Sequence, residues 1–326
     1  PSLVGSEMCI RDRIVQLGKI IKCGKKYFAD EAYRFGVNSY LGFYNNMPDE
    51  EYIKKEFYYK IGEKLDLNNP KTFNEKIQWL KLYDRNPEYI KMVDKYQAKL
   101  YVANVLGNQY VIPTLGVWER AEDIEWESLP NQFVLKVTHD SGGLVVCKDK
   151  RCLDKKAAIK KLNKSLKQNY YLMHREWPYK DVPKRIIAEK YMSDKSGKSL
   201  IDYKVHNFNG VPKMILVCSD RFSDKGLCED FYDINWKKMD LTRPAYRTSD
   251  DKLACPQQLD SMLNLSRKLS EGHPFMRTDF YEIDGKLYFG EITLYPASGL
   301  SKYSSKEWDY TLGRWIELPE KEEEIK

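Results

Sequence analysis

Cysteine is scarce in this sequence, and its few copies are scattered. Seven of the 326 residues are cysteines, an odd number, and no two of them form a C-x-x-C pair. Disulfide frames and zinc sites use paired or closely spaced cysteines, so the sequence predicts neither. The pattern indicates reduced thiols in a cytoplasmic protein.

Long apolar runs are also missing. The longest, such as MILVC at residues 214–218, fall far short of the roughly 20 residues that a membrane-spanning helix needs. No apolar segment of a secretory signal is visible. The sequence therefore predicts no transmembrane segment. A basic stretch near the start contains Lys19, Lys22, Lys25 and Lys26. We favour a solvated helix face for these lysines. Contact with the anionic inner face of the cell membrane is the alternative.

Neither sign of charge dominates the chain. The 54 basic and 48 acidic residues give a net charge of +6, spread over mixed-sign segments such as YIKKEFYYKIGEK. This balance does not require a nucleic-acid partner, and we predict none. It is compatible with a small anionic ligand.

Several familiar catalytic motifs are absent. There is no G-x-x-x-x-G-K-[ST] loop, no H-E-x-x-H or H-x-x-x-H spacing, no G-x-S-x-G elbow and no D-x-D pair. These absences argue against a P-loop NTPase, a zinc protease and an α/β-hydrolase. They also weaken the case for a glycosyltransferase that binds a nucleotide sugar through a metal ion.

The hydrophobic pattern divides the chain into five parts. Residues 1–13 (PSLVGSEMCIRDR) begin without methionine and resemble translated adapter sequence, so we expect them to be an artefact of the gene model. Residues 14–110 have helical spacing, with a capping box at Thr72 and Glu75 and a further helix from about Pro87 to Val105, ending near Gly107. Short β-branched runs and a cationic helix at 154–176 fill residues 111–190; strands return over 191–315, and 316–326 form a charged tail.

The stretch FVLKVTHDSGG, residues 133–143, combines a buried-type strand with a lysine in its middle. Lysine is seldom buried without a partner, and the glycines that follow allow backbone N–H groups to approach a ligand. Lys136 and this loop therefore suggest a phosphate site. A lysine that extends to solvent from an ordinary strand explains the same residues equally well.

A second group of polar residues lies on strands nearer the C-terminus. Strand periodicity places Asp202, Lys204 and His206 on one face. RTDFYEIDGKLYFGEIT, residues 277–293, reads as a hairpin, and we expect a three-residue loop, Ile283–Gly285, that pairs Glu282 with Lys286. Arg277 then faces Glu291, with Asp279 diagonal on the same face. Two carboxylates at that spacing favour a magnesium site over a surface ion pair.

Together these motifs resemble the TupA-like family of the ATP-grasp superfamily. The resemblance runs through NPKTFNEKIQWLKLYDRN, DKYQAKLYV, LPNQFVLKVTHDSGG, FGEITLYPASGL and WDYTLG, from about Leu65 to Gly313. It implies an α+β ATP-grasp fold, in which two α+β subdomains, here residues 111–190 (the lid) and 191–315, hold the nucleotide between them, after a helical N-terminal region. The family is named for teichuronopeptide biosynthesis and occurs among bacterial surface-polysaccharide genes.

The resemblance also implies roles for individual residues, with ATP and Mg²⁺ as cofactors. Lys136 corresponds to the lysine on the α and β phosphates, Lys204 lies near the terminal phosphate, and Arg277 faces the reacting phosphoryl group. Further nucleotide contacts fall on the phosphate-covering loop, the adenine hinge and the D-x-[KR] strand: Ser141, Gly142, Gly143, Glu189, Lys190, Tyr191, Met192 and Asp202. The magnesium ligands are Asp279, Glu291 and Thr293, where many ATP-grasp enzymes have asparagine in place of the threonine. Contacts to the acceptor are assigned to Tyr295, Ser298 and Gly299.

The expected activity is that of a Mg-ATP-dependent carboxylate–amine ligase that works through an acyl phosphate. The carboxylate belongs to a uronic acid, a similar sugar or an amino acid, and an amine is the second substrate. Three alternatives remain: an ATP-dependent sugar kinase on the same fold, a glycosyltransferase of a polysaccharide locus, and a non-catalytic binding or scaffold protein on the same fold.

Overall fold

The computed structural model describes residues 26–140, 142–195, 199–221, 223–224, 226–250 and 252–321. The expected artefact at 1–13, three of the four N-terminal lysines and Ser141 of the predicted phosphate loop lie outside these ranges. The chain divides into two compact units, residues 1–65 and residues 66–326. Each unit is described by itself.

The first unit contains the helices α2 (Glu31–Tyr40) and α3 (Asp49–Ile61). Asp30 caps α2 by accepting a hydrogen bond from the backbone N–H of Tyr33 at 2.9 Å. Phe35 is buried among aromatic rings, with ring centroids 5.1 Å from Tyr44, 5.4 Å from Tyr52 and 5.1 Å from Tyr59. This aromatic cluster is the core that holds α2 against α3.

Three helices open the second unit: α4 (Phe73–Tyr83), α5 (Glu88–Val93) and α6 (Lys95–Leu106). The capping box predicted at the start of α4 is confirmed, because the side chains of Thr72 and Glu75 each bond to the other's backbone N–H. The single helix predicted from Pro87 to Val105 is wrong in one respect. Asp94 breaks it by adopting an extended conformation (φ −72°, ψ 115°), from which its side chain caps α6.

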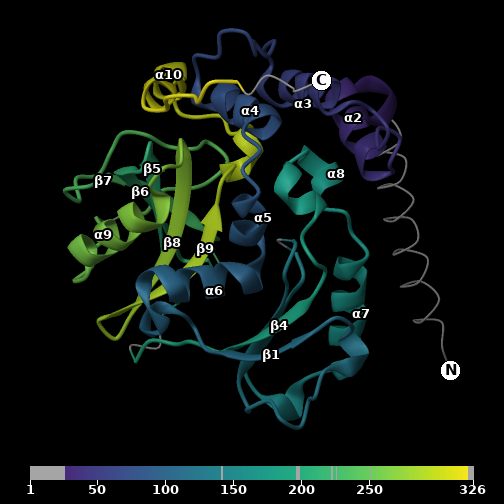
Figure 1. Cartoon of the computed structure of the whole chain (residues 1–326), viewed down its shortest axis with the longest axis vertical. Helices are drawn as coiled ribbons and strands as arrows, with labels where there is room; N and C mark the ends of the chain where they lie inside the picture. The colour runs from purple at the N-terminus through teal and green to yellow at the C-terminus, as the bar shows by residue number, and fades with distance from the viewer. Residues whose placement is uncertain are drawn as a thin grey trace, which may run out of the picture. The chain divides into compact units, whose positions relative to one another are not determined.

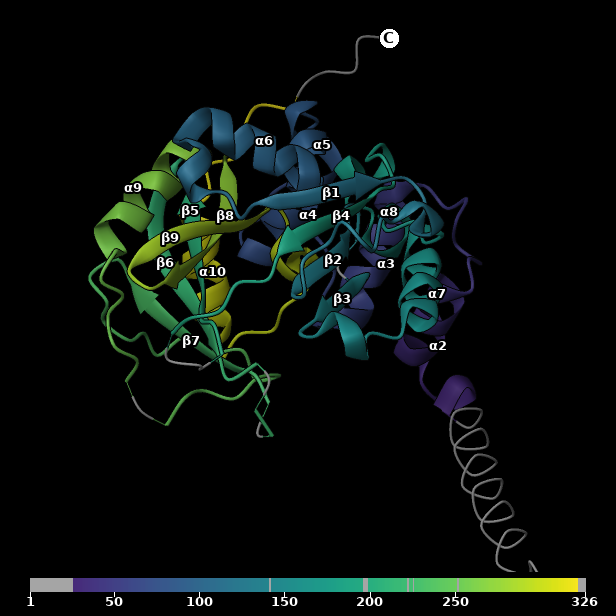
Figure 2. The same cartoon turned by 90° about the horizontal axis from the view of Figure 1, so that it is seen from below.

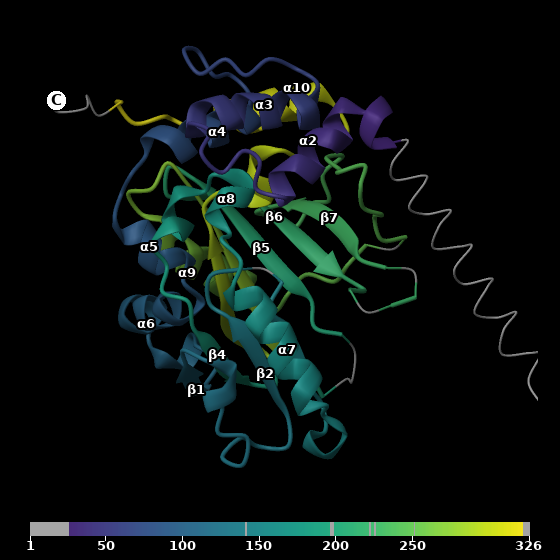
Figure 3. The ribbon, with the colours of Figure 1, turned by 90° about the vertical axis from the view of Figure 1, so that its right-hand side faces the viewer.

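A four-stranded antiparallel sheet follows, formed by β1 (Thr114–Trp118), β2 (Phe133–Val137), β3 (Leu144–Cys147) and β4 (Ile186–Lys190) in the order β1-β4-β2-β3. Alternate residues of β2, including Leu135, point into a core that also contains Leu162 of α7 (Lys155–Leu166). Figure 3 shows α7 lying along one face of this sheet. Lys136 therefore points to the opposite face.

The helix predicted over 154–176 is wrong in length. It ends at Leu166, the last side chain of α7 that packs on the core, and a separate short helix α8 (Tyr171–His174) comes after a turn. Short 3₁₀ turns complete the connections: η1 (Asn108–Tyr110), η2 (Ala121–Asp123), η3 (Lys150–Cys152), η4 (Trp177–Lys180) and η5 (Pro296–Gly299).

The second sheet has five antiparallel strands: β5 (Asp202–Phe208), β6 (Val211–Ser219), β7 (Cys228–Asp233), β8 (Phe275–Ile283) and β9 (Lys286–Thr293), in the order β7-β6-β5-β8-β9. α9 (Leu259–Ser270) packs on one face, where Ser266 bonds to Asn207 and Thr278. α10 (Lys306–Arg314) packs against α4. Two antiparallel sheets with segregated helices confirm the predicted α+β class.

α6 contacts both sheets of this unit. It packs against β9 and α9, and its Lys99 binds Glu189 of β4. Figure 1 shows it beside the β8–β9 hairpin, and Figure 2 shows it beside both the hairpin and β1. Two contacts also tie its first turn to the four-stranded sheet. Asp94 accepts a 2.6 Å hydrogen bond from Arg185, which precedes β4, and the backbone N–H of Lys95 donates to Thr138 at 3.1 Å. The first turn of α6 is thereby fixed to the four-stranded sheet.

Candidate functional site

The turn of the β8–β9 hairpin is shorter than predicted. Ile283 pairs with Lys286, so the loop is Asp284 and Gly285 alone, and both residues have positive φ values of 51° and 74°. Positive φ at both central positions is typical of a two-residue type I′ turn, which matches the twist of the strands. The three-residue loop expected from the sequence is wrong.

A β-bulge restores the arrangement that the shorter loop would have destroyed. The register shifts between Thr278 and Phe280, so that Gly290 and Glu291 lie opposite Asp279. Arg277 consequently pairs with Thr293 and not with Glu291. A Cβ atom on Gly290 would come within 3.2 Å of the Asp279 carbonyl, so a side chain there would crowd the bulge. The bulge brings the two acidic side chains to the same side of the sheet.

Four charged residues form what we call the sheet cluster: Lys204, Arg277, Asp279 and Glu291. Arg277 donates to Asp279 at 2.7 and 2.8 Å and to Glu291 at 3.0 Å, and Lys204, the cross-strand neighbour of Asp279, donates to Asp279 as well. Asp279 is almost fully buried, whereas the Glu291 side chain is 46% exposed. Both carboxylates accept from the same nitrogen, Arg277 Nη2, and therefore converge on one point.

Burial and pairing oppose each other in this cluster. Burial favours the neutral form of Asp279, but Arg277 and Lys204 outweigh it and lower the pKa of that carboxyl. Burial likewise opposes the charge on Lys204, yet Asp279 raises the pKa of its ammonium group. Asp279 and Lys204 are therefore both ionised at neutral pH.

Two further residues on β5 have different surroundings. Asp202 binds Arg221 and the hydroxyl of Tyr281, its cross-strand neighbour on β8. His206 is buried; burial and the nearby Arg277 hold its pKa well below the usual value. It is therefore neutral, and its Nδ1 contacts the Lys204 carbonyl at 3.0 Å.

A second group, the lysine cluster, consists of Lys95, Lys99, Lys136 and Glu189. The carboxylate of Glu189, on β4, is bound by Lys136 of β2 at 2.5 Å and by Lys99 of α6 at 2.6 Å. Burial alone would raise the pKa of Glu189, but the two lysines outweigh it and lower the pKa to about 2. Lys136 therefore has an anionic partner in this structure, and the partner is a carboxylate of the same sheet.

Lys95 interacts with residues of both clusters, and it is not among the site residues predicted from the sequence. Its ammonium group donates to the Asp140 carbonyl and interacts electrostatically with Lys136, Glu189 and Glu291. Burial lowers its pKa. The segment DKYQAKLYV could have indicated Lys95, because an N-cap aspartate is followed there by two lysines, four residues apart, on one face of the helix.

The loop between β2 and β3 is held by Asp140. Its carboxylate accepts from the Gly143 N–H at 3.0 Å and from the Ser165 hydroxyl of α7. A Cβ on Gly143 would lie 2.6 Å from Val137, whereas a Cβ on Gly142 would meet nothing within 4 Å. Gly143 is therefore required by packing, and Gly142 faces open space.

The predicted adenine hinge covers the last two residues of β4, Glu189 and Lys190, and the two that follow the strand. The backbone N–H of Lys190 donates to the Pro113 carbonyl at 3.0 Å, next to the pairing of β4 with β1. Tyr191 and Met192 are half-buried and lie beyond the end of the strand.

The residues assigned to the acceptor lie beyond β9. Ser298 and Gly299 have positive φ values of 56° and 63°, and both of their carbonyls accept from Gln78 of α4 at 2.8 and 2.7 Å. The Ser298 hydroxyl donates to the buried carboxylate of Glu176. Tyr295 is buried, and its hydroxyl bonds to no described residue. Of this segment, Tyr295 thus retains an unused polar group.

The charges of the two clusters fit a phosphate-bearing ligand with a divalent cation. Cations outnumber carboxylates even when Asp140 is counted, and such an excess at a partly buried site favours a polyanion. Within the described ranges, no group of three or more His, Cys, Asp or Glu side chains could hold a metal ion. The convergent carboxylates of Asp279 and Glu291 suit magnesium, which protein sites bind through one or two carboxylates together with substrate phosphates.

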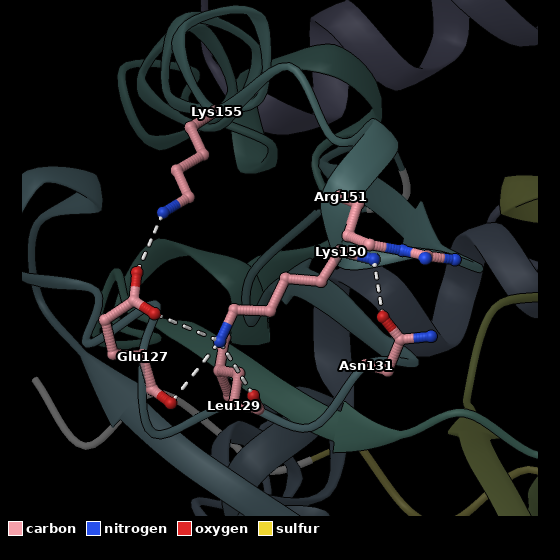
Figure 4. A pocket seen from close by; sticks show the side chains of 6 residues that line it. All are labelled: Glu127, Leu129, Asn131, Lys150, Arg151 and Lys155. Atoms are coloured by element: carbon pink, nitrogen blue, oxygen red, sulfur yellow. Dashed lines mark hydrogen bonds and ion pairs between the residues drawn. The ribbon is translucent and has the colours of Figure 1, made fainter.

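A surface hollow of about 410 Å³ lies elsewhere, on the α7 side of the four-stranded sheet. Figure 4 shows Lys150 and Lys155 pointing toward Glu127, which both bind through ion pairs of 3.6 and 3.1 Å. None of the predicted site residues lines this hollow, whose cations already have a carboxylate partner.

Among the described helices, none has the length and apolar character needed to cross a membrane.

Comparison with known proteins gives one family match. A family model described as TupA-like ATP-grasp matches residues 75–317. This range includes both clusters, both sheets and all of α4 except its first two residues. No curated protein sequence matches the chain.

Solved structures with similar folds include two D-alanine–D-alanine ligases and an ATP-grasp protein. D-alanine–D-alanine ligase of Bacillus anthracis complexed with ATP is 16% identical with a TM-score of 0.38, and the similarity covers 63% of this chain and 55% of that one. The D-alanine–D-alanine ligase of Helicobacter pylori is 17% identical with a TM-score of 0.39, and the similarity covers 75% of this chain and 69% of that one. A RimK domain ATP-grasp protein of Sphaerobacter thermophilus is 11% identical, TM-score 0.41, with 72% and 71% covered. The chain thus spans little more than half the length of the Bacillus ligase, and TM-scores this low carry no argument about individual side chains.

Proposed function

We propose a function for this chain from the premise that it belongs to the TupA-like ATP-grasp family. The chain has the ATP-grasp fold, and we infer that it is a Mg-ATP-dependent ligase that joins a carboxylate to an amine. The observation that carries this proposal is the approach of two charged clusters on two different sheets, linked by Lys95. A triphosphate with its metal ion is long and anionic enough to contact both.

The lysine cluster supplies the contacts to the nucleotide in this proposal. Lys136 and Lys95 bind phosphate oxygens, and the backbone of Gly142 and Gly143 covers them. Adenine binds along the backbone from Glu189 to Met192. Lysine suits this task because a compact ammonium group donates to phosphate oxygens from several directions.

The sheet cluster supplies the reacting end. Asp279 and Glu291, with the Thr293 hydroxyl, hold magnesium, which when bound neutralises the phosphate oxygens. Arg277 and Lys204 bind the transferred phosphoryl group. Phosphoryl transfer depends on positioning and charge neutralisation more than on covalent help from the protein, which agrees with a site made of cations and carboxylates.

The reaction has two steps. A carboxylate oxygen of the substrate attacks the γ-phosphorus and ADP leaves, giving an acyl phosphate. The amine nitrogen then attacks the acyl carbon and inorganic phosphate leaves, giving an amide. We propose a uronic acid or an amino acid as the carboxylate, a cytoplasmic location where ATP is supplied, and surface-polysaccharide biosynthesis as the setting. Tyr295, Ser298 and Gly299 lie beyond Glu291 and contact the acceptor in this proposal.

Hydroxylamine trapping tests this function. An acyl phosphate reacts with hydroxylamine to give a hydroxamate, whereas a phosphoester does not. Purified protein is incubated with Mg-ATP, hydroxylamine and a panel of uronic and amino acids, and hydroxamate and ADP are measured together. We expect both products in equal amounts. ADP with a phosphorylated sugar and no hydroxamate would show a kinase instead.

The site assignment is tested separately with Lys136→Ala, Asp279→Ala and Glu291→Ala. Each is expected to lower hydroxamate formation by at least about a hundredfold, because each removes a charge that the transition state needs. Lys150→Ala, in the surface hollow, is the matched control and should retain wild-type activity. Full turnover in all three site variants would refute the assignment.

A further inference from the structure

Glu189 holds two lysines that differ in their freedom to move. Lys99 is buried together with Glu189, with side-chain exposures of 6% and 8%, whereas the Lys136 side chain is 28% exposed. The two ammonium groups bind opposite oxygens of the carboxylate, Lys99 on Oε1 and Lys136 on Oε2. Glu189 can therefore release Lys136 and keep a cationic partner.

The fold keeps Lys99 in place. α6 is tied to the four-stranded sheet through Asp94 and Arg185 and through the backbone of Lys95 and Thr138, and it also packs against β9. Lys99 lies one turn along the same helix face as Lys95. The Lys99 ammonium group is enclosed with Glu189, whereas the side chain of Lys136 is partly exposed and can reach a ligand.

Charge balance shows what Lys99 contributes. With Lys99 absent, Glu189 and Lys136 would form a neutral, partly buried pair, and a phosphate would have to break that pair to reach Lys136. With Lys99 present, the three groups keep one positive charge in excess, and Glu189 remains neutralised after Lys136 leaves. An unpaired buried carboxylate beside a phosphate chain would otherwise repel it.

We propose that Lys99 is a positioning residue that holds Glu189 as a counterion, so that Lys136 can transfer from Glu189 to the phosphates of ATP. This inference rests on the proposed function, because it requires Mg-ATP to bind at Lys136. Glu189 then acts as a placeholder for phosphate in the nucleotide-free protein. Lys99 itself contacts neither nucleotide nor substrate.

Binding of Mg-ATP to four variants, measured by isothermal titration calorimetry, tests the role of Lys99. Lys99→Met keeps the length of the side chain without its charge and should weaken binding about tenfold or more. Lys99→Arg keeps the charge and should bind within about twofold of wild type. The double variant Lys99→Met/Glu189→Gln removes the counterion as well and should recover most of the lost affinity. Glu189→Gln alone should bind more tightly than wild type, because nothing competes for Lys136.

Recovery in the double variant separates positioning from a purely structural role. If Lys99 only stabilised the fold, the double variant would be at least as impaired as Lys99→Met. Wild-type affinity in Lys99→Met, or no recovery in the double variant, would overturn the inference. Should Lys99→Met not fold, Glu189→Gln decides alone, since weaker binding by that variant contradicts the counterion role. Absence of Mg-ATP binding by the wild-type protein would instead remove the proposed function, and this inference with it.

Discussion

The two proposed magnesium carboxylates should differ sharply in what they contribute to stability. Asp279 is 2% exposed and accepts two hydrogen bonds from Arg277 and one from Lys204, whose side chains are each 12% exposed. Asp279→Ala leaves both cations buried without their main partner, and breaking a buried pair in this way costs about 3–5 kcal/mol. Glu291 still pairs with Arg277, so we expect the lower end, about 3 kcal/mol. At about 2.1 cal/mol/K of unfolding entropy per residue, that corresponds in a chain of 326 residues to a fall of roughly 4–6 °C in Tm.

Glu291→Ala provides the comparison. The Glu291 side chain is 46% exposed and makes one 3.0 Å ion pair with Arg277. An exposed pair of this kind is worth at most about 1 kcal/mol, or at most about 2 °C in Tm. Thermal unfolding of both variants, with and without Mg-ATP, checks the prediction. In the proposed mechanism both variants lose the stabilisation by Mg-ATP, although only Asp279→Ala loses intrinsic stability.

A second variant identifies the cause of the stability loss. Lys204→Met in the Asp279→Ala background removes one unpaired cation and should restore part of the lost stability. Equal Tm values for Asp279→Ala and Glu291→Ala without ligand, or a further fall on adding Lys204→Met, would refute the reasoning. The first result would mean that burial does not control the strength of these pairs.

Two other predictions concern Glu189 and the turn before α10. The pKa of Glu189 is lowered to about 2 in the folded protein, so its contribution is complete above the unfolded value of 4.5 and is lost as the pH falls from 4.5 to 2. Urea unfolding should show that Glu189→Gln is less stable than wild type by up to about 3 kcal/mol at pH 7, and that this difference in free energy of unfolding is smaller at pH 3. A difference that does not change with pH contradicts this prediction. Gly299→Ala should lower the free energy of unfolding by about 2–4 kcal/mol, because φ is +63° and a Cβ would lie 2.6 Å from Ile77. The control Gly142→Ala has open space around the added methyl group and should lower it by less than about 1 kcal/mol.

Features that depend on a few adjacent residues could be predicted from the sequence. The capping box of α4 involves Thr72 and Glu75, three residues apart, and the structure forms it as expected. The strand containing Lys136 is predicted from its β-branched and aromatic residues between turn-forming residues. The Lys136 side chain lies on the face opposite the core, because successive residues of a strand point to opposite faces. In these cases the local pattern and the tertiary structure favour the same conformation.

The β8–β9 hairpin shows where local reasoning is insufficient. Asp284-Gly285 fits a two-residue turn, but that turn alone would place Asp279 and Glu291 on opposite faces. We expected a longer loop to bring them together, and the chain uses a bulge at Gly290 and Glu291 instead. A bulge adds one residue to one strand without a distinctive sequence, so its position depends on contacts across the strands. The predicted convergence of the two carboxylates was obtained from the wrong cause.

The partners of Lys136 could not be predicted for a different reason. Glu189 is 53 residues away in the sequence on β4, and Lys99 lies on a helix that precedes the sheet. Their meeting depends on the strand order β1-β4-β2-β3, which places β4 beside β2, and on the contact of α6 with both sheets. No local pattern of apolar and polar residues encodes either arrangement. The sequence therefore indicated that Lys136 needs an anion but not which anion the protein itself provides.

This internal anion changes how a lysine in a buried strand should be interpreted. Lys136 satisfies the requirement for a partner without any ligand, so its position in β2 does not by itself demand a phosphate. The stronger argument comes from the surrounding charges. Glu189 neutralises only one of the two lysines that it binds, and Lys95 adds another cation whose pKa burial lowers. Enclosing this excess positive charge is unfavourable, and a bound polyanion removes the penalty, so the free energy that the enclosure costs is regained as affinity.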